Sequence, residues 1–144
     1  IVGYYGEQLV LLAQSLGLNS CWVGGTYKVV NRAYNVDLGQ KLAAVIALGY
    51  GTTQGVPHRS KAPQAVVPGY DGAPEWFKRG VDAALLAPTA LNQQKFSFSL
   101  DGEVGDVPVV RASTRRGAFA QMDLGIAQCH FEIGAGPALY RWAE

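Results

Sequence analysis

The stretch GEQLVLLAQSLGLNSCWVGG, residues 6–25, holds a helix signal and a strand signal in immediate succession. Gly17 can adopt the left-handed conformation that ends many helices, so the pattern predicts a helix over residues 4–16 with an apolar face in the core. Residues 20–23 then predict a brief extended segment before a Gly-Gly loop. The apolar positions recur every three or four residues, as on one face of a helix: Tyr5, Leu9, Leu12, Ala13 and Leu16.

The middle of the chain contains one apolar run and one long loop. Residues 41–50 are short and rich in Ala, Val, Ile and Leu, which predicts a buried central strand ending at Gly51. Residues 52–73 are rich in Gly, Pro and small polar residues, and this composition predicts a connecting loop. Pro74 suits the first turn of a helix, which should end before Pro88.

The last third predicts a hairpin and a helix. Residues 95–100 alternate between polar and apolar, and Asp101-Gly102 is a typical hairpin turn. The returning strand should cover residues 104–110. A further helix is expected over residues 117–133, so helices and strands are mixed and an α+β class is predicted.

The overall composition excludes several classes of protein. The 144 residues are 49% hydrophobic and 16% charged, with a net charge of +1, which excludes a disordered chain and argues against a nucleic-acid partner. Cys21 and Cys129 stand alone, so we expect a reducing compartment and two buried, inert thiols. Apolar runs are too short to span a membrane and no signal peptide is recognised, so the expected location is cytoplasmic.

The run APTALNQQKF, residues 87–96, has the chemistry of a ligand cradle. Asn and Gln side chains donate and accept hydrogen bonds without carrying charge, which suits a heterocycle edged with carbonyls and ring nitrogens. None of these residues is a strong nucleophile or base. The alternative is a helix end with Pro88 as breaker and Thr89 or Asn92 as a cap, although a cap explains only one of the polar residues.

Two other segments offer ligand contacts. The backbone N–H groups of Gly24 and Gly25 could face a ring, or the pair could form a plain turn. Residues 58–61 combine His, Arg, Ser and Lys in a proline-flanked loop, which could bind a phosphate or simply be a solvated surface loop. No metal site is predicted, because His58 and His130 have no Cys or carboxylate at metal spacing.

Several segments, taken in chain order, resemble the FMN-dependent nitroreductase family, and in particular its tandem branch, in which one chain carries two half-domains. Residues 6–25 are similar to the family's core helix and flavin-side loop, and residues 47–51 to its central strand. Residues 87–96 are similar to its A-P-S-x-x-N-x-Q-P-W motif. Residues 123–126, with residues 130–132, are similar to the tandem branch's last helix.

The resemblance implies a nitroreductase-like fold with a central, mostly antiparallel sheet flanked by helices. Residues 1–73 would hold the C-terminal part of a first half plus a connecting loop, and residues 74–144 a second half. Family members normally begin with an Arg-Arg-Ser-x-Arg segment, which has no counterpart ahead of Ile1. We therefore expect an N-terminally truncated chain that self-associates or pairs with the missing part.

The resemblance also implies FMN as the cofactor and no catalytic side chain, since the chemistry belongs to the flavin. Electrons would pass from NADH or NADPH through the flavin to a nitroaromatic, a quinone or a related acceptor. The alternative is a non-catalytic module that binds flavin or another small ligand. The residues that would hold FMN are Trp22, Val23, Gly24, Gly25, Arg59, Lys61, Pro88, Thr89, Ala90, Asn92 and Gln94. Thr89, Lys95 and Phe96 depart from the family's usual Ser, Pro and Trp.

Overall fold

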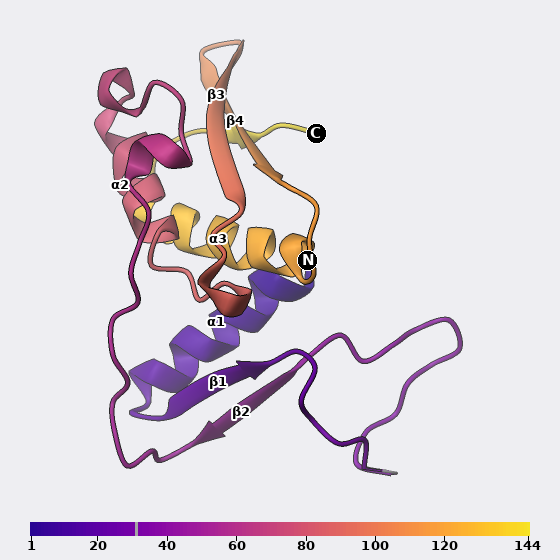
Figure 1. Cartoon of the computed structure of the whole chain (residues 1–144). Helices are drawn as coiled ribbons and strands as arrows, with labels where there is room; N and C mark the ends of the chain where they lie inside the picture. Colours follow the sequence, from indigo (N-terminus) through magenta and orange to yellow (C-terminus); the bar gives the residue numbers. More distant parts are fainter. Residues whose placement is uncertain (31) are drawn as a thin grey trace. The chain divides into compact units, whose positions relative to one another are not determined.

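The computed structural model describes residues 1–30 and 32–144, which form two compact units. One unit comprises residues 1–7 and 56–144, and the other comprises residues 8–55. Both units contain helices and strands, so the predicted α+β class is confirmed. The elements, labelled in Figure 1, are α1 Val2–Ser15, β1 Asn19–Val23, β2 Val45–Gly49, α2 Glu75–Ala84, β3 Phe96–Val104, β4 Val107–Thr114, α3 Ala120–Ala135 and β5 Arg141–Trp142.

The larger unit is built on a three-stranded sheet in the order β3-β4-β5. β3 and β4 form an antiparallel hairpin, and the short β5 lies parallel to β4. α2 and α3 pack against each other, and α3 also contacts β3 and β4 (Figure 1). Aromatic rings join these elements into a single core: Phe77, Phe98, Phe131, Tyr140 and Trp142.

Glycines allow α2 and α3 to approach closely. A Cβ added to Gly80 would lie 2.8 Å from the ring of Phe131, and one added to Gly134 would lie 2.4 Å from the carbonyl oxygen of Arg79. At these two points the backbone of one helix therefore lies directly against atoms of the other helix. Phe77, Val81 and Phe131 are fully buried at the same interface, which explains why α2 needs its strongly one-sided pattern.

The predicted hairpin is present, but the prediction of its turn at Asp101-Gly102 is wrong. β3 continues to Val104, and the chain reverses at Gly105-Asp106. The pairing register shifts between Leu100 and Glu103, so Asp101 and Gly102 form a β-bulge inside the hairpin. Gly102 has φ 83°, which explains why a turn-type dipeptide occurs there.

The predicted first helix exists as α1, but its predicted buried face is wrong except at Ala13. Tyr5, Leu9, Leu12 and Leu16 are all more than half exposed, whereas Glu7, Val10 and Ala13 are buried. In the larger unit, Gly3 and Gly125 bring the start of α1 against α3, and a Cβ at Gly3 would overlap the carbonyl group of Met122. The buried side of α1 is therefore small and partly polar.

The start of α1 is also held to α3 by polar contacts. The carboxylate of Glu7, 1% exposed, lies 2.8 Å from Nε2 of His130. The hydroxyl of Tyr4 donates a hydrogen bond to the carboxylate of Glu132. The same carboxylate accepts a hydrogen bond from the indole N–H of Trp142 at 2.7 Å. His130 is thus paired with a buried carboxylate where α1 meets α3.

The smaller unit contains a two-stranded antiparallel sheet of β1 and β2, with Asn19 opposite Gly49 and Val23 opposite Val45. The prediction of a buried central strand over residues 41–50 is wrong in its burial, because no residue of β2 is buried. Only one neighbouring strand pairs with β2 in the described part of the chain. Cys21 on β1 is exposed, so the prediction of two buried thiols holds only for Cys129.

Candidate functional site

The 87–96 loop has an unusual backbone. Leu91, Asn92 and Gln94 have φ of 53°, 50° and 42°, in the left-handed region that residues other than glycine rarely adopt. Such strain persists only where the surrounding contacts determine the conformation, and it is found at ligand sites more often than elsewhere. Leu91 lies at the centre of the short 3-10 turn Ala90–Asn92 and is completely exposed.

Gln94 provides the contacts that hold this loop. Its side chain is 2% exposed, and its Oε1 accepts the backbone N–H of Lys61 at 2.9 Å. Its Nε2 donates to the carbonyl oxygen of Arg59 at 2.9 Å and to Oδ1 of Asn92 at 2.5 Å. Its own backbone N–H donates to the hydroxyl of Thr89 at 3.0 Å. Gln94 therefore joins the loop to the 59–61 segment.

Lys61 and Asn92 strengthen the same connection from both sides. The ammonium of Lys61 donates to the carbonyl oxygens of Gln93 and Gln94 at 2.9 and 2.6 Å. The amide of Asn92 donates to the carbonyl oxygen of Arg59 at 2.9 Å. The structure thus brings together two segments that the sequence singled out separately, and part of the hydrogen-bonding capacity of Lys61 and Asn92 fixes the backbone.

Asp123 is a member of this arrangement to which sequence reasoning gave no role. It lies in the first turn of α3 and is 3% exposed. One carboxylate oxygen accepts the backbone N–H of Ala90 at 2.9 Å, and the other accepts the side-chain amide of Gln93 at 2.6 Å. A carboxylate is also favoured near a helix N-terminus. Asp123 therefore anchors the loop to the start of α3.

A basic hollow of about 240 Å³ adjoins the loop. Three cationic side chains contribute to its lining, from the 59–61 segment, the end of the loop and the segment after β4: Lys61, Lys95 and Arg115. Gln94 and Ser97 add polar groups. In the sequence, Lys95 is a departure from a family motif, and Arg115 belongs to an Arg-Arg pair that could bind an anion or lie in an exposed charged turn. Nothing local in the sequence indicates that the two residues meet.

The other predicted site residues are placed as follows. Pro88 is exposed, Thr89 is buried and Ala90 is half-buried, while the exposed Arg59 meets the loop through its carbonyl oxygen. Trp22 and Val23 end β1 in the smaller unit and are half-buried. Gly24 and Gly25 follow them directly.

Gly25 has room for a side chain within the described structure. A Cβ there would meet nothing within 4 Å, and its φ lies outside the left-handed range. Neither backbone conformation nor packing within the described residues therefore requires glycine at this position.

Neither a membrane-spanning helix nor a metal-binding group is found over residues 1–30 and 32–144. None of the helices there is both long and apolar enough to cross a membrane. That part of the chain also holds no group of three or more His, Cys, Asp or Glu side chains that could bind a metal ion.

The fold and this site define an α+β protein with a strained, amide-rich loop beside a basic hollow. The sequence matches the family described as "Putative TM nitroreductase" over residues 1–135, and the chain belongs to that family. The resemblance to nitroreductases drawn from the sequence motifs is thereby confirmed at the level of the family. No curated protein sequence matches this chain.

The fold is similar to that of a crystal structure described as a putative nitroreductase from Thermotoga maritima MSB8. The TM-score is 0.63 and the sequence identity is 24%, over 90% of this chain and 51% of that one. The chain therefore spans about half the length of this relative. The similarity confirms the nitroreductase-like fold.

Proposed function

We propose that the chain forms the FMN-binding part of a nitroreductase-type oxidoreductase. The observation that carries the proposal is the hydrogen-bonded assembly of the 87–96 loop with the 59–61 segment, beside a basic hollow, in a chain of the nitroreductase family. When bound, FMN supplies electron transfer between NADH or NADPH and a nitroaromatic, a quinone or a related acceptor.

The donor set fits the chemistry of FMN. A phosphate monoester carries nearly two negative charges near neutral pH, and Lys61, Lys95 and Arg115 supply cations around one hollow. The flavin ring presents carbonyl oxygens and ring nitrogens, which match backbone N–H and amide groups. Apart from the cations of the hollow, the 87–96 loop offers uncharged groups, as expected if the protein positions a cofactor and leaves the chemistry to it.

The residues divide into two roles in this proposal. Gln94, Thr89 and Asp123 hold the loop in its strained conformation, as their hydrogen bonds indicate. Contact with FMN is proposed for the exposed surface of the loop and for the basic residues. Besides Lys61, Lys95 and Arg115, the proposed contacts within the larger unit are Arg59, Pro88, Ala90 and Asn92. For the smaller unit, contact with flavin is proposed from the family resemblance alone, for Trp22, Val23, Gly24 and Gly25.

A titration with FMN, followed by flavin fluorescence or visible absorbance, tests the cofactor. Lys95→Gln and Arg115→Gln should each weaken FMN binding by about tenfold or more, because a charged hydrogen bond contributes about 1.5–3 kcal/mol. Arg116→Gln is the matched control, since it removes the same charge one position away from a residue that lines the hollow. Equal affinity of all three variants and the unmodified chain would contradict the placement of the phosphate.

Reduction of the bound flavin separates an enzyme from a non-catalytic binding module. With FMN bound, addition of NADH or NADPH should bleach the flavin absorbance, and a nitroaromatic or a quinone should restore it. Binding without bleaching would favour the binding module. Absence of FMN binding by the unmodified chain would contradict both.

A second proposal concerns association with another copy of the chain. Within the smaller unit, Leu9 and Leu12 lie on one side of α1 and are 59% and 55% exposed, and Leu16, in the turn directly after α1, is 65% exposed. Such an apolar stripe is typical of a protein–protein contact. We therefore propose self-association through α1, in agreement with the expectation drawn from the sequence.

A further inference from the structure

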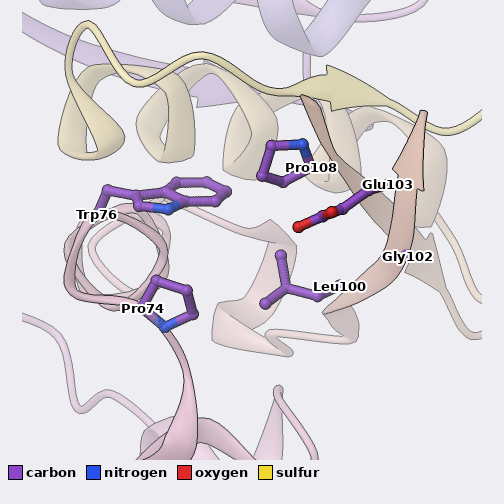
Figure 2. A pocket seen from close by; sticks show the side chains of 6 residues that line it. All are labelled: Pro74, Trp76, Leu100, Gly102, Glu103 and Pro108. Atoms are coloured by element: carbon purple, nitrogen blue, oxygen red, sulfur yellow. The ribbon is translucent and has the colours of Figure 1, made fainter. Parts of the chain in front are cut away.

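A second hollow lies in the larger unit, away from the 87–96 loop, between the start of α2 and the β3–β4 hairpin. Its volume is about 410 Å³, which falls within the range of small-molecule sites. Figure 2 shows the side chains that surround it, and most of them are apolar. They are Pro74, Trp76, Leu100, Gly102, Glu103 and Pro108.

The apolar walls of this hollow are held in place by neighbouring rings. The indole of Trp76 stacks on Tyr140, with centroids 5.3 Å apart and planes at 14°, and meets the edge of Phe77 at 5.7 Å. Pro74 and Pro108 are rigid by their chemistry. Little conformational entropy would be lost when a ligand enters between such walls.

The only charged side chain that lines the hollow is Glu103, and the β-bulge determines its direction. The register shift between Leu100 and Glu103, with Gly102 at φ 83°, changes the side on which the following residue points. Figure 2 shows the carboxylate of Glu103 pointing into the same space as the ring of Trp76 and the side chain of Leu100. A negative charge therefore faces an aromatic ring across an apolar space.

Two carboxylates near this hollow, one on β3 and one on α2, have cationic partners. Asp101 forms an ion pair with Arg111, and Glu75 forms one with Lys78 at 3.1 Å. Glu103 takes part in no ion pair within the described part of the chain, residues 1–30 and 32–144. The charge of Glu103 is thus available to a ligand.

From this geometry we infer that the hollow binds a small organic cation, an ammonium group carried on an apolar body. The face of Trp76 attracts a cation, the carboxylate of Glu103 adds charge complementarity, and Pro74, Leu100 and Pro108 accept the apolar part. A metal ion would find a single carboxylate and no second charged ligand. This site is independent of the proposed FMN site and shares none of its residues.

Titration with benzyltrimethylammonium chloride, followed by NMR chemical shifts of the full chain, tests the inference. We expect saturable shifts at the indole of Trp76 and at the amides of Leu100 to Glu103. Glu103→Gln should weaken binding about fivefold or more, because it removes the charge at an exposed position and keeps the shape. Asp106→Asn is the matched control, since it removes the same charge from the same hairpin outside the hollow and should leave binding unchanged.

Two further comparisons determine whether charge and ring are both needed. Benzyl alcohol, which keeps the aromatic ring and lacks the ammonium, should bind at least fivefold more weakly than benzyltrimethylammonium. Trp76→Leu should weaken the cation by a similar factor, and an unchanged NMR spectrum in the β3–β4 hairpin would show that this variant is folded. Equal binding of the neutral probe, equal binding by Glu103→Gln, or no saturable shift at all would overturn the inference.

Discussion

Helices α1 and α3 have similar apolar spacing in the sequence and very different surroundings in the structure. α3 buries Ile126, Ala127, Phe131 and Ala135 against α2 and the hairpin. α1 exposes Leu9 and Leu12 instead, and Leu16 is exposed directly after its end. The spacing of apolar residues thus predicts that a helix forms and which side is apolar, whereas burial of that side depends on a partner elsewhere in the chain or in another chain.

The largest expected effect concerns the tightly packed helix. Gly134→Ala should lower the free energy of unfolding by about 2–3 kcal/mol, because the new Cβ would lie 2.4 Å from the carbonyl oxygen of Arg79 and from Cβ of Ala83. In an open helix the same change would stabilise by up to about 1 kcal/mol. Urea denaturation of the two proteins measures the difference.

The matched control for that prediction is Gly72→Ala. A Cβ at Gly72 would meet nothing within 4 Å, so the free energy of unfolding should change by less than about 0.5 kcal/mol. If Gly134→Ala were as stable as this control, the close approach of α2 and α3 would not be a determinant of stability.

The sequence predicted the elements well and their environments less well. Helices α1, α2 and α3 and strands β1 and β3 were placed within a few residues, because each depends on local spacing, glycines and prolines. The turn of the hairpin was misplaced because a Gly that permits a turn also permits a bulge. The burial of residues 41–50 was misjudged because apolar composition alone does not show whether a strand is covered on both faces.

Those parts of the candidate site that lie within one continuous segment could be predicted from the sequence. The amide-rich loop and the basic 59–61 segment are visible in the sequence, and the hydrogen bonds of Gln94 show that they lie together. The sequence gives no role to Asp123 or Lys95 and leaves Arg115 open between an anion site and an exposed turn, because their roles depend on contacts with residues far away in the sequence. A carboxylate in the first turn of a helix is too common to single out Asp123 without knowing that Ala90 donates to it.

A second expected effect contrasts the two cysteines. Cys129 is 2% exposed, and burial, with smaller contributions from Glu7 and Glu132, raises the pKa of its thiol to about 11. Its thiol therefore stays protonated at pH 8 and unreactive while the protein is folded. Cys21 is exposed on β1, so Ellman's reagent should modify it at least about 100-fold faster, which a stopped-flow or absorbance time course would measure.

Variants assign the two phases of that reaction. Cys21→Ser should abolish the fast phase, and Cys129→Ser should leave it unchanged. In the unmodified protein the slow phase should accelerate in urea, since unfolding exposes Cys129 and removes the cause of its raised pKa. Equal rates for both thiols in the folded protein would contradict the difference between the exposed β1 and the packed α3.

The smallest expected effect on stability concerns the exposed side of α1. Leu12→Gln should change the free energy of unfolding of the isolated chain by less than about 0.5 kcal/mol, because its side chain is already 55% exposed. The same change should shift self-association to higher protein concentration, because it puts an amide into the apolar stripe of Leu9, Leu12 and Leu16. Sedimentation velocity over a range of concentrations measures this shift.

Gln14→Ala is the control for that prediction. Residue 14 is exposed on the opposite side of α1, so its replacement should leave association unchanged. A chain that stays monomeric throughout, or a Leu12→Gln variant that associates like the unmodified chain, would remove α1 as the contact; a large loss of stability would instead show that Leu12 is covered within the chain itself.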